Sequence, residues 1–258
     1  MDLCIKGKKA LITGGGRGIG RSIAQCLAEE GVKIAVVSRT ESDITELVKE
    51  LGGEKEGHMG IAADLMPEGA PTGVVEQLKK EFGEVDILVH NLGGTLEIRN
   101  PFCPIEDWQK IWRFNFEIML ELNLLLLPYM REKQWGRILS VSSIAALENQ
   151  GPVTYCSVKA ALTAYTRSMG RVLAPQGIVV AAVLPGAVMT EGGYWDIASR
   201  EKPEHVEKYL VDRMAIHRFG RPEEIGRIAA FLCSEHASFC IGSNVLVDGG
   251  QGRCFSIT

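Results

Sequence analysis

One stretch, Thr13-Gly14-Gly15-Gly16-Arg17-Gly18-Ile19-Gly20, joins an apolar strand-like run to a segment of helical period. Glycine adopts the positive φ angles of a tight turn and lets a bound group approach the backbone closely. The N–H groups at the start of the following helix, together with the positive end of its dipole, suit a phosphate. Because a strand precedes the turn and a helix follows it, the stretch predicts a dinucleotide-binding turn.

The rest of the chain repeats this alternation of strand-like and helical segments. The expected strands are Lys9–Thr13, Lys33–Ser38, His58–Ala62, Val85–His90, Arg137–Val141, Ile178–Val183 and Val245–Val247. The expected helices are Gly18–Glu30, Glu41–Leu51, Thr72–Phe82, Trp108–Lys133, Val153–Leu173 and Pro222–Ser234. Several strands are apolar throughout, as in a parallel sheet covered on both faces. We predict one α/β domain over residues 1–258, with a doubly wound parallel seven-stranded sheet of Rossmann type.

Composition excludes several classes of protein. A net charge of -4 gives no electrostatic attraction for nucleic acid. Seven scattered cysteines without a CxxC pair argue against disulfides and favour a cytoplasmic protein, and the five histidines show no metal-ligand spacing. The apolar run Ile118–Met130 spans about 20 Å as a helix, short of a membrane core of about 30 Å. No signal peptide is expected at Met1–Lys9.

The G-xxx-G-x-G spacing and a series of later segments resemble the short-chain dehydrogenase/reductase family over nearly the whole chain, most closely its 3-oxoacyl-carrier-protein reductase-like branch. The matching segments are Thr13–Gly20, Asp64-Leu65, His90–Gly93, Asn115, Ser142-Ser143, Tyr155–Lys159, Pro185-Gly186 with Thr190, and Asp248–Gly250. The resemblance implies a nicotinamide cofactor. It places these residues at the cofactor: Gly14, Gly16, Arg17, Gly18, Ile19, Gly20, Ser38, Arg39, Thr40, Asp64, Leu65, Asn91, Gly93, Tyr155, Lys159, Pro185, Gly186, Val188 and Thr190.

The second strand ends in Ser38, where an NAD site would carry an acid for the ribose diol. Arg39 follows, and Arg17 lies in the glycine turn, so two guanidinium groups are available to a 2′-phosphate. We therefore predict NADP(H) as the cofactor. The alternative is that both arginines are solvated surface charges.

Tyr155 and Lys159 are four residues apart in a helical segment and share one face. A nearby ammonium lowers the pKa of a phenol, and a drop of about three units corresponds to roughly 4 kcal/mol. The pair predicts an acid/base that protonates an alkoxide or deprotonates an alcohol. The resemblance gives Lys159 a second role, a hydrogen bond to the nicotinamide ribose.

Two serines compete for the role of orienting the substrate oxygen. Alignment from the strand selects Ser143, whereas the family's spacing to the tyrosine selects Ser142; we predict Ser143. The resemblance makes Asn115 the fourth catalytic residue. It implies that the helix is kinked there and that a backbone carbonyl freed by the kink binds water. The alternative is that the Asn115 side chain forms a hydrogen bond only within its own helix. His90 replaces the family's usual asparagine, and we expect a local structural partner for it.

Residues 189–221 come directly after a strand and contain no strand pattern. We predict that they form a substrate lid; the alternative is an ordinary surface loop. Tyr194 and Trp195 either line the substrate pocket or form lid core or a subunit contact.

We therefore expect an NADP(H)-dependent oxidoreductase that moves a hydride between nicotinamide and a small carbonyl/alcohol pair. The rivals are a non-catalytic NADP-binding redox sensor, and an epimerase or dehydratase that retains its cofactor. The resemblance also implies a homo-oligomer, tetramer or dimer, formed through Ile118–Met130, the helix after Tyr155 and the tail after Asp248. No metal, membrane or nucleic-acid partner is expected.

Overall fold

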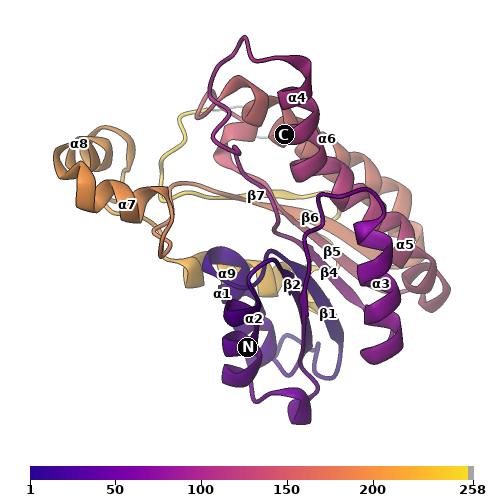
Figure 1. Cartoon of the computed structure of the whole chain (residues 1–258). Helices are drawn as coiled ribbons and strands as arrows, with labels where there is room; N and C mark the ends of the chain where they lie inside the picture. Colours follow the sequence, from indigo (N-terminus) through magenta and orange to yellow (C-terminus); the bar gives the residue numbers. More distant parts are fainter. Residues whose placement is uncertain (255–258) are drawn as a thin grey trace.

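The computed structural model describes residues 1–254 and is built around one sheet (Figure 1). All seven strands are parallel, in the order β3-β2-β1-β4-β5-β6-β7. They are β1 (Lys9–Thr13), β2 (Lys33–Ser38), β3 (Met59–Ala62), β4 (Ile87–His90), β5 (Gly136–Val141), β6 (Ile178–Pro185) and β7 (Asn244–Val247). The predicted fold class is confirmed.

Helices cover both faces of the sheet. The α-helices of residues 1–254 are α1 (Gly18–Glu29), α2 (Glu41–Glu50), α3 (Ala70–Glu81), α4 (Ile105–Trp112), α5 (Ile118–Lys133), α6 (Val153–Leu173), α7 (Tyr194–Glu201), α8 (Pro203–Arg213) and α9 (Pro222–Leu232). Helices α1, α2 and α9 pack on one face, and α3, α5 and α6 on the other (Figure 1). Since each parallel crossover places a helix on a face, the carboxyl ends of the strands stay open at one edge.

The pleat of each strand divides the core in two. In β1, Ile12 packs beneath α1 and α9, whereas its neighbour Leu11 packs beneath α3 and α5. In β2, Val36 and Val37 divide in the same way. Each fully buried side chain of this kind contributes about 1.5–3 kcal/mol to folding. The continuous apolar strands of the sequence are therefore explained by burial on both faces.

The predicted helix Trp108–Lys133 is interrupted. A π-helical turn, Arg113–Glu117, separates α4 from α5, and Asn115 lies within it. The Asn115 amide is one cause, since Nδ2 donates to the carbonyl oxygens of both Ile111 and Gly94, at 3.0 and 2.9 Å. A side chain inserted in this way disturbs the regular i to i−4 ladder.

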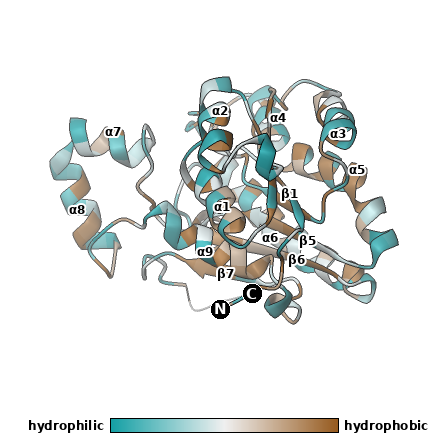
Figure 2. Ribbon diagram, turned by 90° about the horizontal axis from the view of Figure 1, so that it is seen from below, coloured by the Kyte–Doolittle hydropathy of each residue, from teal (hydrophilic) through white to brown (hydrophobic). Residues whose placement is uncertain are grey.

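The segment 189–221 holds the two helices α7 and α8, which project from the body of the molecule and are largely hydrophilic in Figure 2. A β-bridge between Val188 and Gly220 closes the base of this segment. Over the described residues, no helix is both long and apolar enough to cross a bilayer.

Candidate active site

The glycine turn between β1 and α1 has the geometry that its sequence predicts. Gly14 and Gly18 have φ angles of +61° and +58°, which favour glycine. A Cβ on Gly20 would lie 2.4 Å from the carbonyl oxygen of Gly14, so the helix could not approach the strand with a larger residue. The Asn91 amide fixes the turn by donating to the carbonyl oxygens of Thr13 and Gly14, at 3.2 and 2.8 Å.

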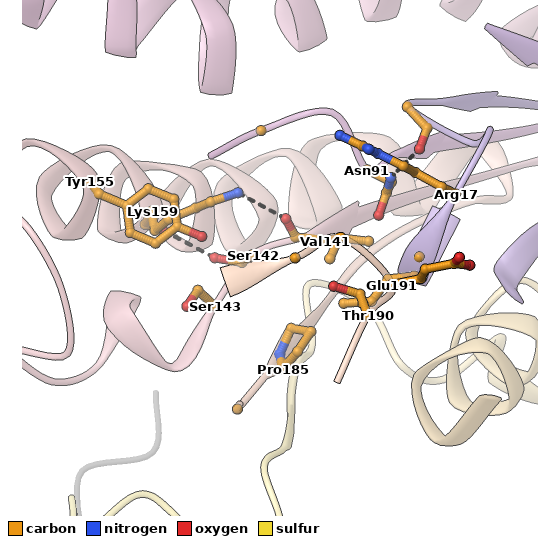
Figure 3. Close-up of a pocket in the computed structure, with 17 residues that line it drawn as sticks. Arg17, Asn91, Val141, Ser142, Ser143, Tyr155, Lys159, Pro185, Thr190 and Glu191 are labelled. Carbon is orange, nitrogen blue, oxygen red and sulfur yellow. Dashed lines mark hydrogen bonds between the residues drawn. The ribbon is translucent and has the colours of Figure 1, made fainter. Parts of the chain in front are cut away.

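Two adjoining cavities form one groove along the carboxyl ends of the strands. They share Gly14, Arg17, Asn91 and Gly93. The first is also lined by Val37, Ser38, Arg39, Thr40, Ala63, Asp64, Leu65, Leu92 and Phe114. The second, shown in Figure 3, is also lined by Gly18, Ile19, Val141, Ser142, Ser143, Tyr155, Lys159, Pro185, Gly186, Thr190, Glu191, Gly192 and Gly193.

Most of the predicted cofactor residues thus lie on one groove, and three do not line it. Gly16 and Gly20 are buried within the turn, where they allow close packing, and Val188 makes the β-bridge to Gly220. Sequence reasoning also missed lining residues that carry no motif, among them Phe114 and Glu191.

The far end of the groove suits a 2′-phosphate. The side chains of Arg17 and Arg39 are exposed, and within residues 1–254 neither forms an ion pair with a carboxylate. Ser38, at the end of β2, brings no negative charge to the cavity. Two unpaired guanidinium groups beside a neutral hydroxyl fit NADP(H) better than NAD(H).

Lys159 lies deep at the other end of the groove. Its side chain is 2% exposed, and its Nζ donates to the carbonyl oxygen of Val141 at 3.0 Å. The ammonium lies 5.5 Å from the ring centroid of Tyr155. Burial lowers the pKa of Lys159 to about 8, because the charged form loses its hydration.

The expected drop in the pKa of Tyr155 is wrong for the protein by itself. Burial raises the pKa of the phenol to about 12, although a hydrogen bond with Ser143 acts in the opposite direction. The Lys159 ammonium lies 5.5 Å from the ring centroid of Tyr155 and donates to Val141, and it does not offset the effect of burial. The phenol is therefore fully protonated at neutral pH and can act as a proton donor.

The two serines at the end of β5 differ in surroundings. Ser143 is half-buried, hydrogen-bonds Tyr155 and accepts from the Ala145 N–H at 3.1 Å. Ser142 is buried, and its hydroxyl donates to the backbone oxygen of Lys159 at 3.4 Å (Figure 3). This geometry favours Ser143 over Ser142 as the serine that meets a substrate.

Asn115 and Lys159 converge on the backbone after β4. A Cβ on Gly93 would lie 2.7 Å from Oδ1 of Asn115 and 3.1 Å from Nζ of Lys159. Asn115 also accepts from the Gly94 N–H at 3.0 Å. The kinked helix therefore fastens the loop that borders both the groove and the lysine.

His90 has the local partner expected for it. Its Nε2 lies 2.8 Å from Oδ1 of Asn123, whose Nδ2 in turn donates to the Tyr165 hydroxyl at 3.0 Å. Burial lowers the pKa of His90 to about 4, so the ring is neutral. This chain of hydrogen bonds ties β4 to α5 and α6 and is structural.

A third cavity, of about 490 Å³, opens beside the groove and meets it at Ser143, Tyr155 and Gly186. Trp195 lies on its wall, with ring centroids 4.1 Å from Tyr209 and 4.7 Å from Phe219. The remaining lining residues are Thr95, Glu97, Arg99, Ile144, Asn149, Gln150, Gly151, Pro152, Ala187, Tyr194, His205, Tyr209, Arg213 and Gln251. Tyr194 and Trp195 thus both line a pocket, and Trp195 also packs in the apolar cluster of the projecting segment, whereas Tyr194 is 52% exposed.

A groove along the carboxyl ends of the strands, whose inner end presents a protonated phenol beside an open pocket, fits a nicotinamide-dependent oxidoreductase. Residues 14–251 match the family model described as enoyl-(acyl carrier protein) reductase. The chain belongs to this family, one of the short-chain dehydrogenases/reductases, as its motifs predict.

Named relatives agree with this assignment. The chain is 32% identical to 3-oxoacyl-[acyl-carrier-protein] reductase FabG of Aquifex aeolicus over 97% of its own length and 100% of the relative's. L-sorbose reductase of Gluconobacter frateurii, solved with NADPH and L-sorbose, superposes with a TM-score of 0.90, 30% identity and coverage of 99% and 100%. A 7α-hydroxysteroid dehydrogenase, solved with NADH and 7-oxo glycochenodeoxycholic acid, gives a TM-score of 0.87, 30% identity and coverage of 99% and 98%.

The expected activity is therefore confirmed. The chain is an NADP(H)-dependent oxidoreductase that transfers a hydride between nicotinamide and a carbonyl/alcohol pair.

Proposed function

We propose that the chain reduces a ketone held in the third cavity, with Tyr155 as proton donor. One observation carries the proposal: Ser143, Tyr155 and Gly186 line both the groove and this cavity. A substrate carbonyl at the junction would therefore be within reach of the phenol, of the serine hydroxyl and of the inner end of the groove.

Bound NADPH supplies the hydride to the carbonyl carbon. Ser143 donates a hydrogen bond to the substrate oxygen and stabilises the charge that develops on it. Tyr155 gives its proton to that oxygen, and its pKa of about 12 keeps the proton available at neutral pH. The reverse oxidation uses the same groups in the opposite order.

Lys159 and Asn115 complete the proposed catalytic set. Lys159 would hold the nicotinamide ribose with the hydrogen bonds that Val141 leaves free, since an ammonium has three donors. Asn115 would fix the loop at Gly94 against which Lys159 packs. We also propose that residues 189–221 form a substrate lid, because α7 and α8 supply Trp195 and Tyr209 to the cavity wall.

The chemistry of the cavity favours a substrate with an apolar body. Aromatic rings of Tyr194, Trp195 and Tyr209 form one wall, and Arg99 and Arg213 stand at the exposed rim. The relatives span acyl thioesters, a ketose and an oxo-steroid. Consumption of NADPH should be followed by absorbance with one member of each class, and with an enoyl thioester because of the family's description.

We expect turnover of the acyl or steroid ketone and little turnover of the ketose. NADPH binding without turnover of any ketone or alcohol would favour the redox sensor instead. Cofactor retained through purification, with no net oxidation or reduction, would favour an epimerase or dehydratase.

We further propose a homo-oligomer, tetramer or dimer, in the cytoplasm. Exposed apolar side chains on α5 and α6 support this, including Leu124 and Val172, which are 67% and 61% exposed. Light scattering after size-exclusion chromatography tests the assembly. A monomer at micromolar concentration would contradict it.

A further inference from the structure

The end of the described chain folds back onto the substrate cavity. Gln251 is 3% exposed although it lies only four residues beyond the last strand. Its Oε1 accepts from the Ala187 N–H at 2.7 Å, and its Nε2 donates to the Tyr209 hydroxyl at 2.7 Å. Both ends of this buried amide are therefore satisfied.

The two hydrogen-bond partners of Gln251 belong to different parts of the molecule, one at the edge of the sheet and the other in the projecting segment. Ala187 is the second residue after β6 and follows Gly186, which lies at the junction of the cavities. Tyr209 lies on α8, in the projecting segment, and contacts Trp195. Gln251 is thus a polar bridge from the rigid edge of the sheet to the wall of the substrate cavity.

The backbone on both sides accommodates this bridge. A Cβ on Gly186 would lie 2.6 Å from Oε1 of Gln251, so only glycine leaves room for the amide. Gly249 and Gly250 have φ angles of +63° and +74°, and the Asp248 carboxylate accepts from the Gly250 N–H at 3.0 Å. The turn therefore directs residue 251 inward.

Arg253 and Cys254 extend the connection along the cavity rim. A guanidinium N–H of Arg253 donates to the backbone oxygen of Asp212 at 2.7 Å, at the end of α8. The Cys254 N–H donates to Glu148 at 2.6 Å, in the loop between β5 and α6. The C-terminal segment thus joins α8 to the opposite side of the cavity.

We propose that Gln251 is a positioning residue that clamps α8 over the substrate cavity and thereby sets the affinity for substrate. The proposal rests on the cavity being the substrate site. Gln251 lines the cavity and its amide holds Tyr209, so loss of the amide frees the aromatic wall without altering a contact of Tyr155.

The test compares Gln251→Met, Tyr209→Phe and the double variant in the full chain. Methionine has a similar length but cannot make either hydrogen bond. We expect KM for the ketone to rise about three- to tenfold in each single variant, and the double variant to be no worse, because both remove the same bridge. The kcat and the Kd for NADPH should change less than about twofold. Gln77→Met, on the exposed face of α3, is the matched control.

Hydrogen exchange gives a readout that does not depend on turnover. Amides of residues 194–213 should exchange faster in Gln251→Met, while those of β5, β6 and α6 keep their protection. Unchanged KM and unchanged exchange would overturn the proposal. A joint fall in kcat, NADPH affinity and thermal stability would also overturn it, since this is the result of a merely structural role. If the wild type turned over no ketone, faster exchange would still support the clamp while the proposed function failed.

Discussion

The groove and the cavity beside it are built in different ways. The groove is lined mainly by residues at the ends of consecutive strands, each within a short motif. The cavity takes its walls from segments far apart in the sequence, including Arg99, Gln150, Trp195, Tyr209 and Gln251. The residues of the cofactor half can therefore be recognised from local motifs, whereas those of the substrate half are recognised only from tertiary contacts.

Their surfaces differ as well. The groove offers glycine backbone and two unpaired guanidinium groups, as a charged nucleotide requires. The cavity offers aromatic rings that bury apolar surface. The proposed proton transfer takes place at the junction of the groove and the cavity. Variants at this junction should therefore have the largest effects on kcat.

Removing the hydroxyl at the junction should break turnover and leave both halves intact. Tyr155→Phe should lower kcat by about a thousandfold, because a positioned acid contributes about 10²–10⁴. The Kd for NADPH, measured by fluorescence titration, should stay within about twofold. Turnover within tenfold of the wild type would refute the role of Tyr155.

The serines test which side of β5 faces the substrate. Ser143→Ala should lower kcat by about a hundredfold, as expected for loss of one donor to a developing oxyanion. Ser142→Ala removes only a buried 3.4 Å hydrogen bond and should lower kcat less than about threefold. The two variants serve as controls for each other in stopped-flow assays. The opposite ranking would make Ser142 the catalytic serine.

The same contrast explains what the sequence could predict. Repeated β-α-β units predict the doubly wound parallel sheet but not its strand order, and Gly14, Gly18 and Lys159 lie where their motifs put them. Tyr209 and Gln251 could not be predicted as cavity residues, because only tertiary contacts bring them together.

The pKa of Tyr155 could not be predicted from spacing either. A separation of four residues places Lys159 on the same helix face, but the direction of its ammonium depends on Val141, in another element. Burial of the phenol then determines the direction of the shift and raises its pKa. Sequence pattern thus gives proximity, whereas the pKa depends on orientation and desolvation.

The preference for NADPH over NADH tests only the end of the groove that holds Ser38 and Arg39. The double variant Ser38→Asp/Arg39→Leu should lower kcat/KM with NADPH by about 10- to 100-fold, because it removes a charged hydrogen-bond donor and adds repulsion of a 2′-phosphate. Activity with NADH should be kept or rise. Arg131→Leu removes an exposed arginine of α5 that does not line the groove and is the control. Equal losses with both cofactors would contradict the assignment of Ser38 and Arg39.

The smallest expected effect is on the free energy of unfolding, which should increase when the catalytic Lys159 is replaced. The pKa of Lys159 falls from 10.5 to about 8 on folding, so at pH 7 the buried charge costs about 3 kcal/mol. Lys159→Met removes that cost but also a hydrogen bond to Val141 worth about 1 kcal/mol. We therefore expect the variant to be about 1–2 kcal/mol more stable than the wild type in urea unfolding at pH 7.

The sign of the pH dependence separates this desolvation effect from better packing. Between pH 8 and 10.5 the unfolded wild type holds a proton on Lys159 that the folded protein has released, so wild-type stability from this group rises with pH. The advantage of Lys159→Met should shrink over that window and reverse above it, whereas a packing gain would stay constant. Lys110→Met, at an exposed lysine of α4, should show neither behaviour. A variant less stable than the wild type at pH 7 would mean that Lys159 stabilises the fold as well as serving catalysis. Burial of its ammonium would then have no net cost in the free energy of unfolding.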